Sequence, residues 1–357
     1  MTSRLAMLAW KEVLQLLRDR ATLAMLLGIP LLQIVLFGCA IELNPSHVSV
    51  ELVGNNERVV QRVSSMMRGA GLSLEVQRRA TLAEARAAQW RGEALLVIDL
   101  DARPVHVYLD ATDPILASHA RAQIESFVRS LGDPLSGTDE APPPVHIEDL
   151  YNPGARTQPF ILTGLLGLIL TMTLIAMSAL SLARERERGT LENLLVLRTT
   201  ALELAVGKLA PYLLLAILQA ALVLAVTYFG FRVPQHGSLV LLTLATLVFA
   251  AANLSLGFAF SALARQQMQA MQLSFFYFLP SALLSGFMFP FAAMPGWAQS
   301  IGEWLPLTHY LRIVRGVALR AVDSSFVGTQ LLPIILFALA AGGLGVLACR
   351  LSLRQLR

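Results

Sequence analysis

The chain has few charged residues and few cysteines for its length. Of its 357 residues only 15% are charged while 55% are hydrophobic, and the mean hydropathy is +0.60. Soluble domains carry roughly 25% charged residues, so this composition excludes an ordinary soluble enzyme. Two cysteines exclude a disulfide scaffold and a cysteine-rich metal site.

The sequence also lacks a nucleotide-binding Walker loop. No GxxxxGK[ST] string occurs, and the pair Gly207-Lys208 is followed by leucine. Such a loop supplies the backbone N–H groups that cradle phosphates. We therefore expect this chain to bind no cofactor of its own, and any uphill transport would draw its energy from another subunit.

Charges are absent from six long stretches of the chain. These stretches are 21–41, 157–183, 209–231, 233–264, 266–302 and 324–349. Each exceeds the roughly 20 apolar residues that a helix needs to cross a hydrocarbon core about 30 Å thick. The pattern predicts an α-helical multi-pass membrane protein. Its six transmembrane helices are placed at 21–41, 157–183, 209–231, 238–263, 268–290 and 328–349.

Basic residues fall mainly on one side of these six spans. Both termini lie on the same side, which holds 13 lysines and arginines against four in the short loops of the other side. The positive-inside rule therefore predicts cytoplasmic termini, including the tail 350–357. Arg312, Arg315 and Arg320 are a local exception on the outer side.

The first 20 residues read as an amphipathic helix. Leu5, Ala9 and Val13 follow helical spacing, and Lys11 lies on another face. A helix of this kind is typical of the membrane interface. We predict a cytoplasmic interfacial helix over 1–20.

The segment 42–156 has a different pattern, with alternating apolar residues and 16 acidic residues against 11 arginines. Strands are predicted near 48–52, 72–76, 94–98, 104–109 and 145–150, and helices near 57–69, 81–90 and 114–130. Four histidines in this segment match no metal-ligand spacing, so no metal site is predicted. They are His47, His106, His119 and His146. We predict an α+β extracytoplasmic domain inserted between helices 1 and 2.

The predicted spans contain no acidic residue, which argues against an ion-driven transporter and an intramembrane aspartyl protease or metalloprotease. Their polar residues are neutral amides and hydroxyls. Gln33, Thr171, Asn253 and Gln272 are candidates for a substrate path. The alternative is that such residues form hydrogen bonds between or within helices, as they commonly do.

The loop 184–208 carries a dense run of charge followed by an apolar edge. Gly189 is expected to end the preceding helix, and Thr190 to cap a new one. Glu192 would lie at the positive end of that helix, and Leu195 on its apolar edge. A short helix of this kind suits docking to a soluble partner. A solvated charge run at anionic lipid is the alternative.

The loop string RERERGTLENLLV resembles the Glu-x-Gly-Thr-x-Glu segment of ATP-binding-cassette (ABC) type-2 permeases, the membrane subunits of ABC exporters. Segments 10–41, 151–170 and 285–320 resemble three further blocks of that family in the same order. The large insertion 42–156 is similar to that of its drug-efflux-like subgroup. The segment after Arg198 reads Thr-Thr-Ala, where relatives often have proline.

The resemblance implies a type V ABC exporter-like half-transporter in a bacterial inner membrane, with ATP and Mg bound by two partner ATPase subunits. It also implies that the loop 184–208 contains a coupling helix that docks onto the ATPase. The matching positions are Glu187, Gly189, Thr190, Glu192 and Leu195.

The resemblance further implies short re-entrant helices over 291–323 on the outer side. The residues assigned to this outer gate are Pro290, Pro295, Trp297, Glu303, Trp304, Pro306 and Arg315. The prolines break helices, and the tryptophans suit the membrane interface. Whether the charged residues touch substrate or only hold the gate is left open by the sequence.

These observations predict the permease subunit of an ABC exporter for hydrophobic or amphipathic compounds. Its predicted partners are ABC ATPases, a second copy or a similar permease, a periplasmic adaptor protein and the lipid membrane, with no nucleic acid. The competing hypothesis is a non-transporting scaffold or sensor whose extracytoplasmic domain binds a ligand.

Overall fold

The computed structural model describes most of the chain. The described residues are 7, 9–14, 28, 31, 47–53, 73–99, 102, 104–112, 117–118, 120–122, 124–125, 145–151, 157–189, 200–233, 236–291 and 294–355. Most of the predicted first span 21–41 and the predicted helix 57–69 therefore lie outside the described residues.

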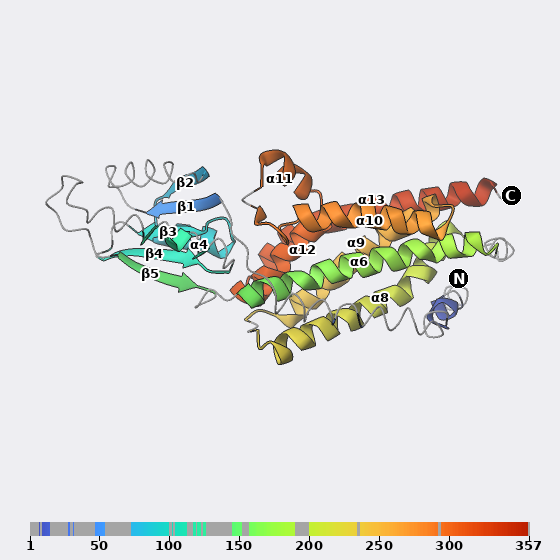
Figure 1. Ribbon diagram of the computed structural model, residues 1–357, viewed down its shortest axis with the longest axis horizontal. Coiled ribbons are helices and arrows are strands. Elements are labelled where there is room, and N and C mark those ends of the chain that lie inside the picture. The colour runs from blue at the N-terminus through green and yellow to red at the C-terminus, as the bar shows by residue number, and fades with distance from the viewer. Residues whose placement is uncertain are drawn as a thin grey trace.

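A bundle of long helices forms one part of the molecule (Figure 1). Its members are α6 (Thr157–Glu187), α8 (Ala201–Ala225), α9 (Leu239–Leu263), α10 (Gln267–Leu284) and α13 (Ser324–Gln355). Among the described residues, four helical stretches are long and apolar enough to cross a membrane. They are Pro159–Glu187, Ala201–Gly230, Leu239–Leu263 and Ser324–Ser352. The chain is thus a helical protein of the membrane type.

The helix α10 is shorter than the predicted fifth span, 268–290. It ends at Leu284, and Gly286 takes a left-handed φ of 86° just beyond it. Glutamines at its start lower its hydropathy, and it is not among the four apolar stretches. A total of six crossings remains a prediction.

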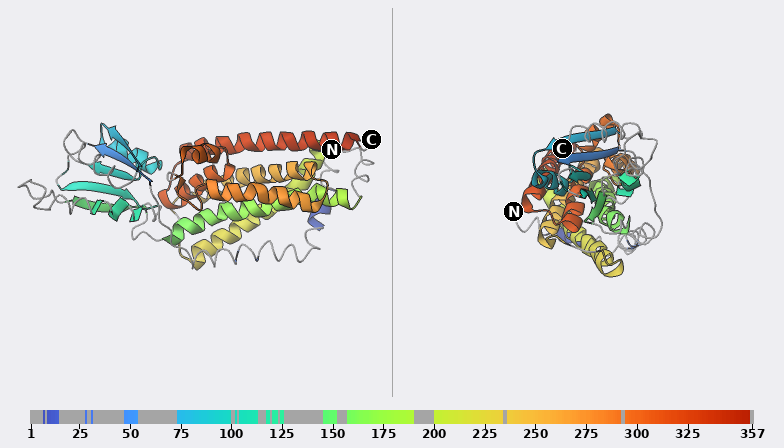
Figure 2. Two further views of the ribbon diagram at one scale, coloured as in Figure 1. Left: turned by 45° about the horizontal axis from the view of Figure 1, so that its top comes forward. Right: turned by 90° about the vertical axis from the view of Figure 1, so that its left-hand side faces the viewer.

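The bundle is built around α6, which is mostly buried, whereas α13 runs along its edge and is mostly exposed (Figure 2). Gly257 of α9 allows a close approach to α6, because a Cβ there would overlap Ser178 and Ile175. Small residues are the usual means of bringing membrane helices together.

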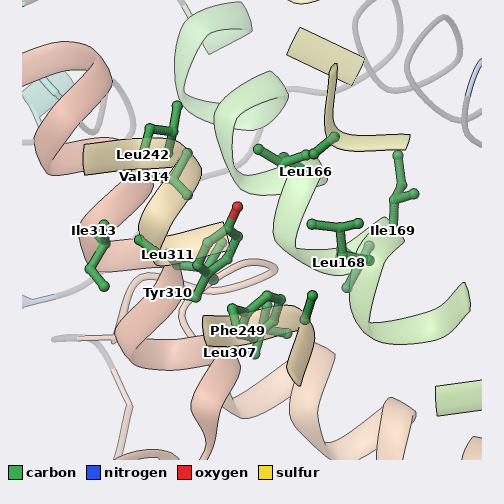
Figure 3. Close-up of a cluster of buried hydrophobic side chains, with 14 of the residues drawn as sticks. Leu166, Leu168, Ile169, Leu242, Phe249, Leu307, Tyr310, Leu311, Ile313 and Val314 are labelled. Atoms are coloured by element: carbon green, nitrogen blue, oxygen red, sulfur yellow. The ribbon is translucent and has the colours of Figure 1, made fainter. Parts of the chain in front are cut away.

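The centre of the bundle is a cluster of leucines and aromatic rings from α6, α9 and α12 (Pro306–Arg315), shown in Figure 3. The rings of Phe249 and Tyr310 stack with their centroids 4.0 Å apart. The Tyr310 hydroxyl lies 2.8 Å from the Thr246 hydroxyl. The polar group of this buried ring is therefore paired.

A five-stranded sheet lies at one end of the bundle (Figure 1). Its strands are β1 (His47–Val53), β2 (Ser73–Arg79), β3 (Leu96–Asp99), β4 (Val105–Asp110) and β5 (Val145–Leu150), in the order β2-β1-β3-β4-β5. Only the β3–β4 pair of this sheet is antiparallel. The five predicted strands and the helix α4 (Leu82–Trp90) are present. Apolar side chains of β1, β3 and β4 form its core.

The two ends of the bundle differ, and we call them the sheet end and the loop end. The loop end holds the helical residues 9–14, the end of α6 and the start of α8 (Figure 1). At the sheet end, α10 is followed by α11 (Gly296–Gly302), α12 and the π-helix η4 (Gly316–Arg320). Short helices therefore occupy the predicted gate segment 291–323.

Candidate functional site

A group of buried charged side chains lies at the loop end. The Lys208 side chain is 2% exposed, and its Nζ lies 3.2 Å from Glu185 Oε1 and 3.4 Å from Glu12 Oε2. Lys11 Nζ lies 2.6 Å from the same Glu185 oxygen. Tyr212 donates a hydrogen bond of 3.1 Å to Glu12. We call these five residues the lysine cluster.

The lysine cluster balances its own charge, with two ammonium groups facing two carboxylates. Buried charges are tolerated when they are paired and hydrogen-bonded, and removal of one partner leaves the other unpaired. Lys208 also donates to the Ser181 carbonyl oxygen at 3.2 Å. The cluster thereby joins three separate segments: the helix 9–14, the last turns of α6 and the first turns of α8.

The lysine cluster was missed by the sequence analysis, which treated Lys11 only as part of a polar helix face. The rarity of lysine in the sequence could have pointed to this cluster. The chain has 28 basic residues, and only Lys11 and Lys208 among them are lysines. Both of these lysines contact Glu185.

The end of α6 is tied to three neighbouring helices, α9, α10 and α13. Arg186 donates to the carbonyl oxygens of Ala264 and Ala262 and to the Ser352 hydroxyl of α13. The Glu187 carboxylate accepts hydrogen bonds of 3.1 and 2.9 Å from the backbone and side chain of Gln267. The base of the predicted coupling loop is thus held firmly.

Beyond α6 the chain turns where the sequence analysis expected it. Gly189 has a φ of 67°, a left-handed conformation that suits glycine after a helix. The other predicted coupling residues, Thr190, Glu192 and Leu195, lie outside the described residues. The chain enters α8 through a capping box, in which the side chain of Thr200 and that of Glu203 each accept a hydrogen bond from the other's backbone N–H.

At the sheet end, the predicted gate residues lie on or beside α11 and α12. Glu303 accepts hydrogen bonds of 3.0 and 2.5 Å from Arg312. Burial alone would raise the pKa of Glu303, but the Arg312 hydrogen bonds and charge outweigh it, and the pKa is lowered. Arg315 donates to the Gly286 carbonyl oxygen and lies 3.7 Å above the Phe160 ring.

The other predicted gate residues shape the turns of this segment. Pro290 lies in the turn after α10, Pro295 immediately precedes α11, and Pro306 is the first residue of α12. Trp297 and Trp304 are 67% and 83% exposed. Exposed indole rings beside half-buried arginines are typical of a position at a membrane surface.

Among the described residues, the candidate substrate-path residues form no hydrogen bond with one another. The buried Thr171 hydroxyl bonds the Gly167 carbonyl oxygen, and the buried Asn253 amide bonds the Phe249 carbonyl oxygen, each within its own helix. Gln272 is exposed on α10. Gln33 lies outside the described residues, and the role of all four residues remains a prediction.

The sheet brings two of the four histidines side by side. His106 on β4 is paired with His146 on β5, and their rings lie 5.4 Å apart. In the described part of the chain, no group of three or more potential ligands is arranged to hold a metal ion.

Comparison with known proteins gives the family that the sequence resembles, both from a family model and from individual relatives. A model described as ABC-2 family transporter protein matches residues 20–348. The probable multidrug ABC transporter permease YbhR of Escherichia coli K12 is 28% identical over 361 residues, which cover 96% of this chain and 97% of that protein.

Two further relatives come from the same bacterium. The probable multidrug ABC transporter permease YbhS is 28% identical over 333 residues, covering 88% of each chain. The inner membrane transport permease YhhJ is 29% identical over 200 residues, covering 55% of this chain and 54% of that protein. Because the family model spans nearly the whole sequence, including three of the four apolar helices in full and most of the fourth, the chain belongs to the ABC-2 family of transporter proteins.

Proposed function

We propose that this protein is the permease subunit of an ABC exporter, and that separate ATPase subunits drive it by pressing on the segment between α6 and α8. The lysine cluster carries this proposal. Glu185 lies in the last turn of α6 and Lys208 in the first turns of α8, and the two side chains are in direct contact.

The contact suggests how force would enter the bundle. A load on residues 190–199 would reach α6 and α8 together, because the cluster joins their ends. It would also reach the helix 9–14 through Lys11 and Glu12. Since α6 is the most buried of the apolar helices, a shift at its end would be passed to the helices packed around it.

The proposed cargo is a hydrophobic or amphipathic compound. Two relatives are named as probable multidrug permeases, and the apolar helices here carry neutral polar side chains inside the bundle. The proposed assembly pairs this chain with a second copy or a similar permease above two ATPases that bind ATP and Mg. In this assembly the loop end faces the cytoplasm, and the sheet lies outside, within reach of an adaptor.

Co-purification with an ABC ATPase from the same source tests the proposal. The full chain is expected to retain the ATPase and to change its rate of ATP hydrolysis. Gly189→Pro and Glu192→Arg are expected to lose both effects, because they alter the docking segment. Arg265→Gln serves as a matched control, since Arg265 is exposed at the same end between α9 and α10.

Two results would contradict the proposal in different ways. If both loop variants bound and stimulated the ATPase as the parent does, the coupling assignment would be wrong. If no ATPase bound the parent chain, the scaffold or sensor hypothesis would take its place, and ligands of residues 42–156 would be sought.

A further inference from the structure

The three arginines that break the basic-residue pattern of the sequence each bind a different part of the molecule. Arg312 binds Glu303 at the end of α11. Arg315 binds the turn after α10 through the Gly286 carbonyl oxygen. Arg320, the last residue of η4, reaches out of the bundle and binds the sheet.

The contact of Arg320 with the sheet is a buried ion pair. Its Nη2 lies 2.5 Å from Asp110 Oδ2, and the two side chains are 17% and 2% exposed. Asp110 is the last residue of β4, and its other carboxylate oxygen accepts a hydrogen bond from the Thr112 backbone N–H. The backbone N–H of Thr112 therefore fixes the orientation of the carboxylate that binds Arg320.

Two further groups surround Arg320. Trp90, at the end of α4, donates a hydrogen bond of 3.2 Å from its indole N–H to the Arg320 carbonyl oxygen. Gly92 has a φ of 78° and lies so close to the guanidinium that a Cβ would overlap it. The sheet side thus encloses both the backbone and the side chain of Arg320.

The π-helix η4 is also held by the bundle. The His236 backbone N–H donates to the Ala318 carbonyl oxygen, and Gly237 packs directly against the Val317 carbonyl group. Both residues precede the start of α9. A π-helical turn is uncommon and is frequently found at functional positions. Here both the sheet and the bundle contact η4, and we call this π-helix the joint.

We propose that Asp110 and Arg320 are positioning residues that hold the sheet in one orientation on η4, so that the sheet and α12 move as one body. A carboxylate that is almost fully buried needs its partner, and any rotation of the sheet away from η4 would separate them. The inference goes beyond the transport role and does not depend on it.

Distances between spin labels in the purified full chain test this proposal. One label is placed at Ala83→Cys on α4 and the other at Ser300→Cys on α11, both exposed, after Cys39 and Cys349 are replaced by alanine. The parent is expected to give a single narrow distance distribution. Asp110→Asn and Arg320→Gln are each expected to give a broad distance distribution, because each removes the ion pair.

The double variant and a nearby control sharpen this test. Asp110→Asn combined with Arg320→Gln should be no broader than either single change, because both remove the same contact. Arg91→Gln removes an arginine from an exposed ion pair with Glu93, beside the joint, and should keep the narrow distribution. Narrow distributions in both single variants would overturn the proposal, as would equal broadening in the control.

A second label pair separates loss of orientation from general unfolding. Labels at Leu263→Cys on α9 and Leu347→Cys on α13 report the bundle alone and should be unchanged in every variant. If the single charge variants failed to fold, the double variant Asp110→Asn with Arg320→Gln would replace them, because it removes the ion pair and leaves no buried charge without its partner. A narrow sheet-to-bundle distribution in the double variant would then overturn the proposal. None of these measurements requires an ATPase or a cargo.

Discussion

Lys11 and Lys208 lie on the same carboxylate oxygen of Glu185, at 2.6 and 3.2 Å. The first lysine is 42% exposed and the second 2%. One carboxylate is therefore shared between an ammonium group at the surface and another inside the bundle. This difference in burial leads to opposite expectations for the two lysines.

Replacing Lys208 with methionine is expected to destabilise the protein by about 3–5 kcal/mol, because Glu12 and Glu185 would be left buried without their shared cation. The matched change Lys11→Met should cost no more than about 1 kcal/mol, since its ammonium group is partly solvated. Denaturant unfolding in mixed micelles measures both. Equal losses of unfolding free energy in the two variants would show that burial does not determine how much each ion pair stabilises the protein.

Gly257→Ala is expected to destabilise the packing of α6 against α9 by about 1–3 kcal/mol, because the new methyl group would overlap Ser178 and the backbone of Ile175. Gly343→Ala on α13 is the matched control, as nothing lies within 4 Å of its added Cβ. The control should stay within about 0.5 kcal/mol of the parent. The same unfolding measurement compares them, and equal effects would contradict the close approach.

Tyr310→Phe is expected to cost about 0.5–1.5 kcal/mol, because it removes the hydroxyl that pairs with Thr246 and keeps the ring stacked on Phe249. Tyr228→Phe provides the comparison. The buried Tyr228 hydroxyl has no hydrogen-bond partner among the described residues, so its removal should be neutral or stabilising. A larger loss in Tyr228→Phe than in Tyr310→Phe would contradict this assignment.

Glu303 is expected to make the stability of the folded protein depend on pH in the acidic range. Its pKa is lowered in the folded protein, so its contribution is present above the ordinary carboxyl pKa of about 4.3 and is lost as pH falls through the folded value. His309 lies 3.8 Å from the same carboxylate. Melting temperatures of the parent and Glu303→Gln between neutral and acidic pH should converge at low pH. Curves that stay parallel would exclude this contribution.

Features set by neighbouring residues were predictable from the sequence. The alternation in 42–156 predicted five strands that are present, because the side-chain period of a strand is a local property. The glycine after the charged end of α6 predicted the left-handed turn at Gly189 for the same reason. The charge-free stretches likewise predicted the four apolar helices.

Contacts between distant segments were not predictable. Lys208 and Glu12 are 196 positions apart, and Arg320 and Asp110 are 210 apart, so no periodic pattern connects them. For the neutral polar residues of the helices, the sequence left two roles open. Thr171 and Asn253 satisfy their side chains on their own helix backbones, which the sequence alone does not distinguish from lining a path.

The scarcity of lysine gives this protein a built-in chemical reporter. Among side-chain amines, a succinimidyl ester added to the folded protein would find Lys11 accessible and Lys208 shielded. Acylation of Lys208 would require α8 to separate from α6 and from the helix 9–14. The extent of reaction at this single amine, followed by mass spectrometry, would therefore record how often the loop end opens.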